Sequence, residues 1–345
     1  MTKRTFPGGS KSRINAAGVA VRAGLATSDD LLAIEEWRSA HTAVINTFQA
    51  LLRSRAKAVG AEVVQRLKRK ATIFDKLTRH AGMELSRMDD VAGCRIIFRD
   101  VASLTEFRDS LHRARFAHVL RNDPDKYDYI KRPKLDGYRG IHDIYSYQVN
   151  SDEGRHLKGL NIELQYRTLI QHTWSTTVEI LSHITGHDPK YHRGDRRYVE
   201  AMALASEMLA RAFEGKKGPC PGLPDQEVAR YFHALDEQLG LLLRLKALQV
   251  ADKSKGSTNR HFILMRGTGW QGYLSVSNYA TAEVAKRELF RLEQAYPNAD
   301  IVYVTGETTD AVRLAYKNYF DDAVEFLEKL TLATRELGII PPVLG

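Results

Sequence analysis

The segment Asn161-Ile-Glu-Leu-Gln-Tyr-Arg-Thr168 alternates polar and apolar side chains along its length. Successive side chains of a β-strand point to opposite faces of the sheet. A strand here places Glu163, Gln165 and Arg167 on one face and the apolar residues between them on the other. We therefore predict a strand that is buried on its apolar face and forms the floor of a polar cleft on the opposite face.

The segments on both sides of this strand alternate between helix and strand patterns. Residues 168–184 have the apolar spacing of an amphipathic helix. Upstream, Cys94-Arg-Ile-Ile-Phe98 is short, apolar and β-branched, as expected for a buried strand, while residues 104–115 and 144–149 predict a helix and another strand. This order predicts an α+β fold in which helices flank a mixed β-sheet.

The rest of the chain divides at changes in composition. Residues 1–27 are basic, rich in Gly, Ala and Ser, and aperiodic, which predicts a flexible tail. A helical pattern follows to residue 59, and a second covers residues 61–80. Gly215 to Pro224 is rich in Gly and Pro, so we expect a hinge there, followed by one helix from Asp225 to about Val250.

A small C-terminal unit follows, with strands predicted at residues 261–265, 272–277 and 300–305 and helices at 281–295 and 309–330. The predicted parts of the chain are a basic tail (1–27), an α+β domain (28–213), a hinge with its connecting helix (214–257) and a C-terminal domain (258–345).

Composition excludes several classes of protein. The 345 residues, 43% of them hydrophobic, are enough for two domains with cores of their own. No apolar run approaches the roughly 20 residues that cross a bilayer, so we expect a cytoplasmic protein without a membrane partner. The two cysteines, Cys94 and Cys220, provide neither a disulfide framework nor a zinc site.

Charge is concentrated in the first part of the chain. Residues 1–214 contain 35 Lys and Arg against 26 Asp and Glu, whereas residues 215–345 contain 16 of each, so the net charge of +9 lies entirely in the first part. A one-sided basic region is typical of proteins that meet nucleic acids or nucleotides.

Three further polar groups suit phosphate chemistry. On the predicted helix of residues 61–80, the cations include Arg66 and Lys68 and a stripe at helical spacing that could hold a triphosphate (Arg69, Lys76, Arg79). Asp90 stands just before a buried strand, where one or two carboxylates suffice for Mg²⁺ bound to phosphate. Between Tyr127 and His142, three tyrosines alternate with four cations, a pattern for base stacking and phosphate binding. Each group also has an ordinary interpretation as a solvated surface or a capping residue.

Four ordered motifs carry a family resemblance, and they cover about 110 residues: Arg66-x-Lys68, Asp89-Asp90-x-x-Gly93-x-Arg95, Tyr129-Ile-x-x-Pro-Lys-x-x-Gly-Tyr-x-x-x-His142 and Glu163-x-Gln-x-Arg-Thr168. Together they resemble the synthetase domain of RelA/SpoT homologues. The resemblance implies a nucleotidyltransferase-like fold that transfers pyrophosphate from ATP to a ribose 3′-hydroxyl and releases AMP.

The resemblance also implies roles for single residues. It assigns ATP binding to Arg66, Lys68, Lys76 and Arg95, Mg²⁺ binding and catalysis to Asp90 and Glu163, and acceptor binding to Tyr138, Lys134, His142, Gln165 and Arg167. Tyr138 would stack on the acceptor base, and Glu163 would hold the metal or activate the hydroxyl. The loop reads Asp-Gly-Tyr-Arg-Gly-Ile-His where alarmone synthetases usually have Asn-Gly-Tyr-x-Ser-Leu-His, which disfavours GDP or GTP as acceptor.

The domain order resembles fused toxin–antitoxin proteins of the CapRel type. In these, a zinc-finger-like C-terminal domain without zinc ligands docks a Tyr-x-x-Tyr motif into the adenine pocket, and Tyr316-Lys-Asn-Tyr319 fits that pattern. The resemblance implies an autoinhibited toxin that modifies the 3′ end of tRNA, blocks translation and is released by a phage protein. The alternatives are a small alarmone synthetase that makes (p)ppGpp or (p)ppApp, and a catalytically inactive RNA-binding module.

Overall fold

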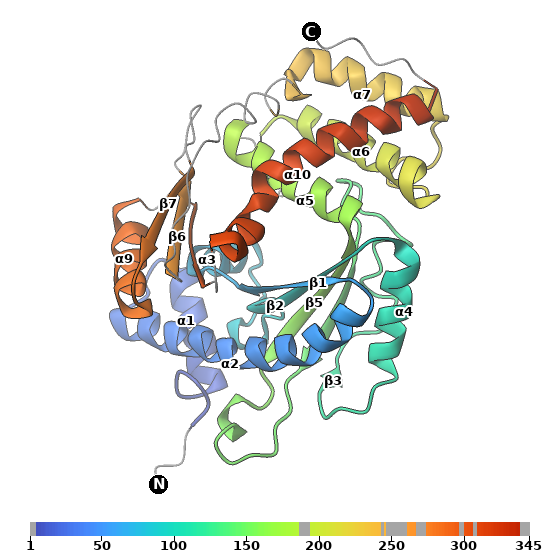
Figure 1. Ribbon diagram of the computed structural model, residues 1–345. Coiled ribbons are helices and arrows are strands. Elements are labelled where there is room, and N and C mark those ends of the chain that lie inside the picture. Colours follow the sequence, from blue (N-terminus) through green and yellow to red (C-terminus); the bar gives the residue numbers. More distant parts are fainter. Residues whose placement is uncertain are drawn as a thin grey trace. The chain divides into compact units, whose positions relative to one another are not determined.

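The computed structural model describes residues 5–185, 194–242, 245, 261–266, 274–296, 300–305 and 309–338. The chain forms two compact units (Figure 1). Unit 1 consists of residues 1–131 and 140–169, and unit 2 consists of residues 132–139 and 170–345. The short segment 132–139 therefore belongs to the same unit as the C-terminal half of the chain.

Unit 1 is built on a five-stranded mixed sheet with the order β1-β2-β5-β4-β3. Strands β2 and β5 are parallel and the other neighbours are antiparallel, which confirms the predicted mixed sheet. The strands are β1 (Glu62–Leu67), β2 (Ala92–Phe98), β3 (Val119–Leu120), β4 (Ile141–Ser146) and β5 (Asn161–Thr168). The helices are α1 (Lys11–Arg22), α2 (Ser28–Ala58), α3 (Lys70–Arg79), α4 (Val101–His112) and the short 3₁₀ helices η1 (Leu85–Arg87) and η2 (Arg155–Leu157).

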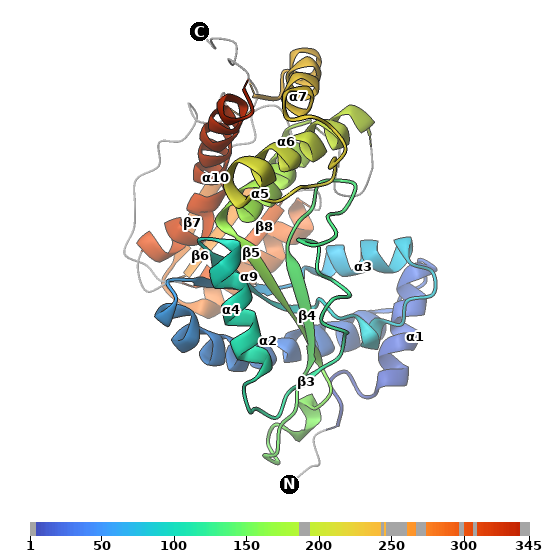
Figure 2. The same cartoon turned by 90° about the vertical axis from the view of Figure 1, so that its right-hand side faces the viewer.

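The two faces of this sheet differ as the alternation in β5 predicts. The apolar side chains of β5 are fully buried. Phe107 of α4 lies 6.5 Å from the ring of Tyr166, and Phe48 of α2 lies 5.8 Å from Tyr145, whose register partner on β5 is Ile162. Both α2 and α4 (Figures 1 and 2) therefore pack on the apolar face, and the polar side chains of β5 lie on the opposite face.

The prediction of a flexible tail over residues 1–27 is wrong for residues 11–22. Residues 11–22 form α1, and the Ser10 side chain caps the helix by accepting a hydrogen bond from Arg13 N. Ile14 and Ala17 are fully buried in the core of unit 1. The apolar face of α1 consists largely of small residues, so its helical period is weak in the sequence.

The prediction of one helix over residues 61–80 is also wrong. Residues 62–67 form the edge strand β1, paired antiparallel with β2, and only residues 70–79 form a helix. Arg66 therefore stands on a strand and Lys68 in the turn after it. The strand is partly exposed and rich in polar residues, and the pairing with β2 that fixes it is not visible in the local pattern.

Unit 2 contains a helical core and a small sheet. Helices α5 (Leu169–Thr185), α6 (Arg196–Glu214), α7 (Asp225–Leu239) and α10 (Thr309–Glu336) share one apolar cluster that includes Phe232 and Phe326. Strands β6 (His261–Arg266), β7 (Leu274–Tyr279) and β8 (Asp300–Thr305) form an antiparallel sheet with the order β7-β6-β8, on which α9 (Ala282–Ala295) packs. This confirms the strands and helices predicted there, while the zinc-finger-like character stays a prediction.

The two units do not divide at the predicted hinge. The segment Gly215 to Pro224 lies inside unit 2, where the Glu207 carboxylate accepts a hydrogen bond from Cys220 N and Arg211 donates to the carbonyls of Cys220 and Leu223. Glu207 is fully buried, so it ties this loop to α6. Gly and Pro here mark a tight connection between two packed helices.

The predicted helix from Asp225 to Val250 is interrupted. Helix α7 ends at Gly240, which adopts the left-handed conformation with φ +61°. Residues 243, 244 and 246–250 of that prediction lie outside the described part of the chain. Among the helices that are described, none is both long enough and apolar enough to cross a bilayer.

Candidate active site

The register of the sheet brings the predicted residues of unit 1 together. Arg66 of β1 and Glu163 of β5 flank Gly93 of β2 on either side. In the next row, Gln165 lies between Arg95 of β2 and His142 of β4. Residues paired directly across neighbouring strands point to the same face. Residues that are far apart in the sequence therefore line one polar surface.

Glu163 is the centre of a hydrogen-bonded row on β5. Its Oε1 lies 2.8 Å from His142 Nδ1, and its Oε2 accepts a hydrogen bond from Gln165 Nε2 at 2.6 Å. Arg167 Nη2 donates to Gln165 Oε1 at 3.3 Å. The three polar side chains of β5 therefore share one face, as the alternation predicts.

Asp90 is held between two lysines. Lys68 Nζ lies 2.8 Å from Asp90 Oδ2, and Lys76 Nζ lies 2.9 Å from Asp90 Oδ1. Lys68 is only 6% exposed, and its main chain is fixed by Val91 O and by Arg38. These two ion pairs connect the turn after β1 and the helix α3 to the residue Asp90 just before β2.

The carboxylates respond to burial and to these cations in different ways. Burial acts to raise the pKa of Asp90, but Lys68 and Lys76 outweigh it and lower the pKa below its ordinary value. For Glu163, burial is likewise outweighed, here by His142, Gln165 and Arg66, so its pKa is lowered. Asp89 behaves in the opposite way because burial dominates and raises its pKa, although Arg121 and Lys76 act against it.

The carboxylates fit the requirements of a magnesium ion bound to a polyphosphate. The charge of Glu163 acts to raise the pKa of both Asp89 and Asp90, so the three groups lie within electrostatic reach of one another. Among the described residues no cluster of three or more His, Cys, Asp or Glu side chains is arranged for a metal. Magnesium in such sites usually takes one or two carboxylates and completes its shell with phosphate oxygens and water.

The remaining residues predicted to bind the acceptor stand on the segment 132–139, which belongs to unit 2. Lys134 Nζ lies 5.1 Å from the centre of the Tyr138 ring, and Tyr138 is half-buried against the helical core. Gly137 has φ +97°, and a Cβ there would lie 2.6 Å from Trp174 Cζ2. Only glycine suits this backbone and this space.

A buried network that the sequence analysis missed anchors the same segment. Arg139 is 2% exposed, donates Nε to Ser206 Oγ at 3.0 Å and forms an ion pair with Glu214. Ser206 Oγ in turn donates to Gly137 O at 2.6 Å, and Gln171 donates to Glu214 at 3.0 Å. These partners come from α5 and α6, and no local sequence pattern points to them.

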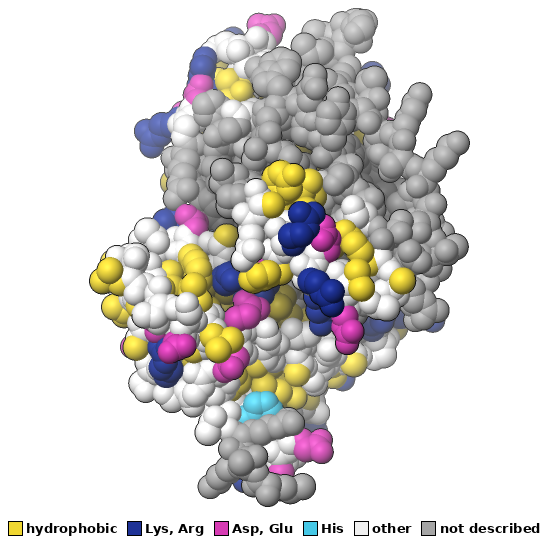
Figure 3. All heavy atoms as spheres, turned by 90° about the vertical axis from the view of Figure 1, so that its left-hand side faces the viewer, with side chains coloured by type: hydrophobic (Ala, Val, Ile, Leu, Met, Phe, Trp, Pro, Cys, Tyr) yellow, Lys and Arg dark blue, Asp and Glu magenta, His cyan; other side chains and the backbone are white. Residues whose placement is uncertain are grey.

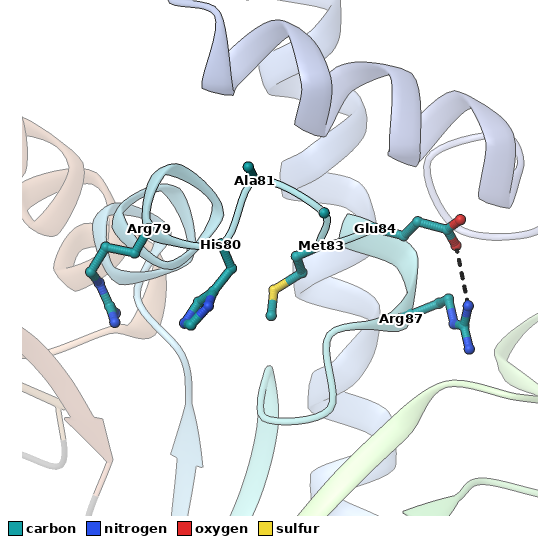
Figure 4. A pocket seen from close by; sticks show the side chains of 7 residues that line it. Arg79, His80, Ala81, Met83, Glu84 and Arg87 are labelled. Carbon is teal, nitrogen blue, oxygen red and sulfur yellow. Dashed lines mark ion pairs between the residues drawn. The ribbon is translucent and has the colours of Figure 1, made fainter.

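An open pocket of about 640 Å³ lies at the end of α3. Arg79 and Arg87 stand on opposite sides of it, with His80 and Met83 between them (Figure 4). Arg87 is paired with Glu84 at 3.9 Å. Arg79, a member of the predicted cationic stripe, is the last residue of α3 and lines this pocket.

Tyr316 and Tyr319 lie on α10, as predicted. Their side chains are outside the described part of the structure. Their inhibitory role therefore stays a prediction from the sequence.

This arrangement, a mixed sheet with cations and carboxylates gathered on its polar face, defines a candidate polyphosphate-binding site. Residues 65–184 match the region found in RelA / SpoT proteins. All four motifs lie within these residues, so the chain carries the RelA/SpoT region.

Individual relatives match parts of the chain. It is 30% identical to the GTP pyrophosphokinase YjbM of Bacillus subtilis (strain 168) over 123 residues, which are 35% of this chain and 56% of the relative. It is 27% identical to the uncharacterized protein Rv1366 of Mycobacterium tuberculosis over 186 residues, 54% of this chain and 63% of the relative. The chain thus spans less than two thirds of the length of either relative.

A solved structure also resembles the chain. The small alarmone synthetase 1 from Bacillus subtilis, bound to its product pppGpp, is 21% identical and aligns with a TM-score of 0.44. The alignment covers 60% of this chain and 96% of that chain.

Proposed function

We propose that this protein is an ATP-dependent pyrophosphotransferase. The observation that carries the proposal is the pairing of Asp90 with Lys68 and Lys76 on the sheet face where Glu163 and His142 also meet. Lys68 and Lys76, which pair with a carboxylate in this structure, can also bind the oxygens of a triphosphate. Several reactions use a bound polyphosphate, and the match to the RelA/SpoT region supports pyrophosphate transfer as the one proposed here.

In the proposed reaction, the 3′-oxygen of a ribose attacks the β-phosphorus of ATP. The bond between that phosphorus and the α,β-bridging oxygen breaks, AMP leaves, and the hydroxyl loses its proton. Lys68, Lys76, Arg66 and Arg95 would bind the donor and stabilise the charge on its phosphate oxygens. Mg²⁺, when bound, would be held by Asp90 and Glu163 and would neutralise part of the same charge.

The lowered pKa of Glu163 bears on its role. A strongly acidic carboxylate is a weak proton acceptor near neutral pH, since general bases work best with a pKa close to the working pH. Glu163 is therefore better suited to holding a cation and orienting His142 and Gln165 than to taking the proton itself.

For the acceptor, we propose the 3′ end of tRNA, with Tyr138 stacking on the terminal base. The excess of basic residues in positions 1–214 supports an RNA, because an RNA is held through many phosphates. Four exposed cations around the loop support it as well: Lys126, Lys131, Arg132 and Lys134. On the face drawn in Figure 3, Lys and Arg are interspersed with Asp and Glu, so among the described side chains that face carries no continuous basic patch.

A nucleotide acceptor is the second candidate, with (p)ppGpp or (p)ppApp as product. It is favoured by the similarity to YjbM, whose name describes a GTP pyrophosphokinase. A mononucleotide needs only a few cations and the stacking ring, so Lys134 and Tyr138 would suffice to bind it.

For the C-terminal domain, we propose that Tyr316 and Tyr319 inhibit the enzyme and that a phage protein relieves the inhibition. The packing of α10 limits how this release occurs. Phe326, Leu330 and Ala333 of α10 are at most 1% exposed in the core of unit 2. Complete detachment of residues 258–345 would expose them, so release would have to involve the N-terminal part of α10.

A labelling experiment tests the reaction and the acceptor together. The full chain is incubated with γ-labelled ATP and Mg²⁺, and with intact tRNA, GDP, or tRNA whose terminal ribose diol has been cleaved by periodate. Label in intact tRNA but not in oxidised tRNA supports the leading proposal. Label in GDP supports the second candidate. ATP binding without transfer to any acceptor would refute a pyrophosphotransferase and leave the RNA-binding module.

A further inference from the structure

Helix α1 fastens the end of helix α3. Arg22, the last residue of α1, donates Nε to Leu77 O at 3.0 Å, and its Nη2 donates to Met83 O at 2.7 Å and to His80 O at 3.5 Å. The last carbonyl groups of a helix have no partners within the helix, and a cation there also complements the helix dipole. Arg22 therefore caps α3 from another helix.

Two more contacts join α1 to the loop that follows α3. Asn15 Oδ1 accepts a hydrogen bond from Ser86 N at 2.9 Å. Gly18 faces Leu85 of η1, and a Cβ at Gly18 would lie 2.8 Å from Leu85 Cβ. Helix α1 thus approaches η1 as closely as a glycine permits, and it holds the loop at both ends.

This fastened loop, residues 80–88, lies between two parts of the donor site. Lys76 precedes it on α3, and Asp89 and Asp90 follow it directly. The ion pair of Lys76 with Asp90 closes the loop at 2.9 Å. Any movement of the loop would therefore change the position of Lys76 relative to Asp90.

We infer that α1 is a positioning element of the donor site and that Arg22 is its main positioning residue. The inference rests on the proposed function because it assigns the site to ATP. Arg22 acts through the carbonyls of Leu77, His80 and Met83, and its hydrogen bonds fix the end of α3 that presents Lys76 and Arg79. Residues outside the RelA/SpoT region of 65–184 thereby determine how tightly ATP is bound.

The test compares Arg22→Ala with Arg13→Ala in the full chain. Arg13 lies on the same helix but pairs with Asp30 of α2, so its replacement removes an ion pair of α1 without removing any contact to the loop. We expect Arg22→Ala to weaken binding of a non-hydrolysable ATP analogue roughly tenfold, with an unchanged KM for the acceptor. Arg13→Ala should leave ATP binding unchanged. Arg22→Lys should restore part of the affinity, since an ammonium group can reach one of the carbonyls.

Amide hydrogen exchange separates this inference from the proposed function. In Arg22→Ala, exchange in residues 80–90 should become faster, whether or not the protein binds ATP. Unchanged exchange there would overturn the inference, and so would equal losses of ATP and acceptor affinity. If Arg22→Ala does not fold, Asn15→Ala removes the contact with Ser86 and serves the same comparison. Failure of the wild type to bind the analogue would refute the proposed function alone.

Discussion

The proposed donor site and the proposed acceptor loop (residues 132–139) are held in place by different means. On the donor side, Lys68 and Lys76 hold Asp90, from which they stand only 22 and 14 residues away in the sequence. The acceptor loop is fixed by Gly137 and by buried Arg139, whose partners stand 67 and 75 residues further along. The proposed donor site thus depends on charge pairing in unit 1, and the proposed acceptor loop depends on packing in unit 2.

The largest expected effect comes from Glu163→Gln, which keeps the shape of the side chain and removes its charge. We expect transfer to fall by roughly 10²-fold or more, because charge placed at a reacting centre contributes on that scale. The rate is measured with labelled ATP, and thermal unfolding checks the fold. Glu153→Gln, in an exposed turn, is the matched control. Equal turnover of Glu163→Gln and wild type would remove Glu163 from the mechanism.

Gly137→Ala tests whether packing alone holds the acceptor loop. The new methyl group would meet Trp174 and force a positive φ on alanine, so the loop must move. We expect acceptor affinity to fall roughly 30-fold, while binding of an ATP analogue stays unchanged. Gly222→Ala is the control, since a Cβ there has no neighbour within 4 Å. A parallel loss of ATP affinity would show that the two regions are not independent.

Tyr138→Ala removes the stacking ring and leaves the loop anchored. Stacking contributes about 1–3 kcal/mol per base. Because the loop stays anchored by Gly137 and Arg139, we expect a loss near the lower end of this range, about tenfold in acceptor affinity, which is smaller than in Gly137→Ala. Equilibrium binding of tRNA and of GDP gives the measurement, with Tyr231→Ala on the exposed side of α7 as control. A loss of ATP affinity instead would mean that Tyr138 serves the donor.

The smallest effect on the site itself is expected from a pH dependence of stability in unit 1, where His41 is buried. Burial lowers the pKa of His41 to about 4, even though its Nδ1 donates to Trp37 O. The unfolded state takes up a proton near pH 6.5 and the folded state does not, so stability is lost as pH falls from 6.5 toward 4. At pH 5 the loss is about 2 kcal/mol.

Urea unfolding of wild type and of His41→Asn at pH 8 and pH 5 measures this loss. The variant keeps a donor for Trp37 O and cannot be protonated, so the advantage of the wild type should shrink at pH 5. A constant difference between the two proteins would show that His41 is not neutral in the fold. Hydrogen exchange at pH 5 then reports whether the acceptor loop loosens together with α2.

The parts of the site that could be predicted from sequence are those fixed by local alternation. The face shared by Glu163, Gln165 and Arg167 follows from the period of a strand, and Asp90 follows from its place before a buried strand. The four motifs are also short local patterns, so the sequence alone was sufficient to indicate the RelA/SpoT region.

What could not be predicted depends on distant partners. β1 is a partly exposed edge strand that is defined by its pairing with β2. The local pattern of residues 61–80 does not contain this pairing and predicts a helix for Arg66. The small residues of α1 give little apolar signal, although they allow the close approach to Leu85. The role of Arg139 requires Ser206 and Glu214, and no pattern in the loop itself names them.

Unit 2 is made of two separate stretches of sequence, residues 132–139 and 170–345. During synthesis, the first stretch is therefore made well before its partners in the second. A ribosome that adds roughly 5–20 residues per second needs about 4 to 15 seconds to pass from Arg139 to its partner Glu214, 75 residues later. Unit 1 is complete in sequence at residue 169, before α6 is made. The nascent chain therefore has the sheet of the proposed donor site before the anchor of the proposed acceptor loop exists.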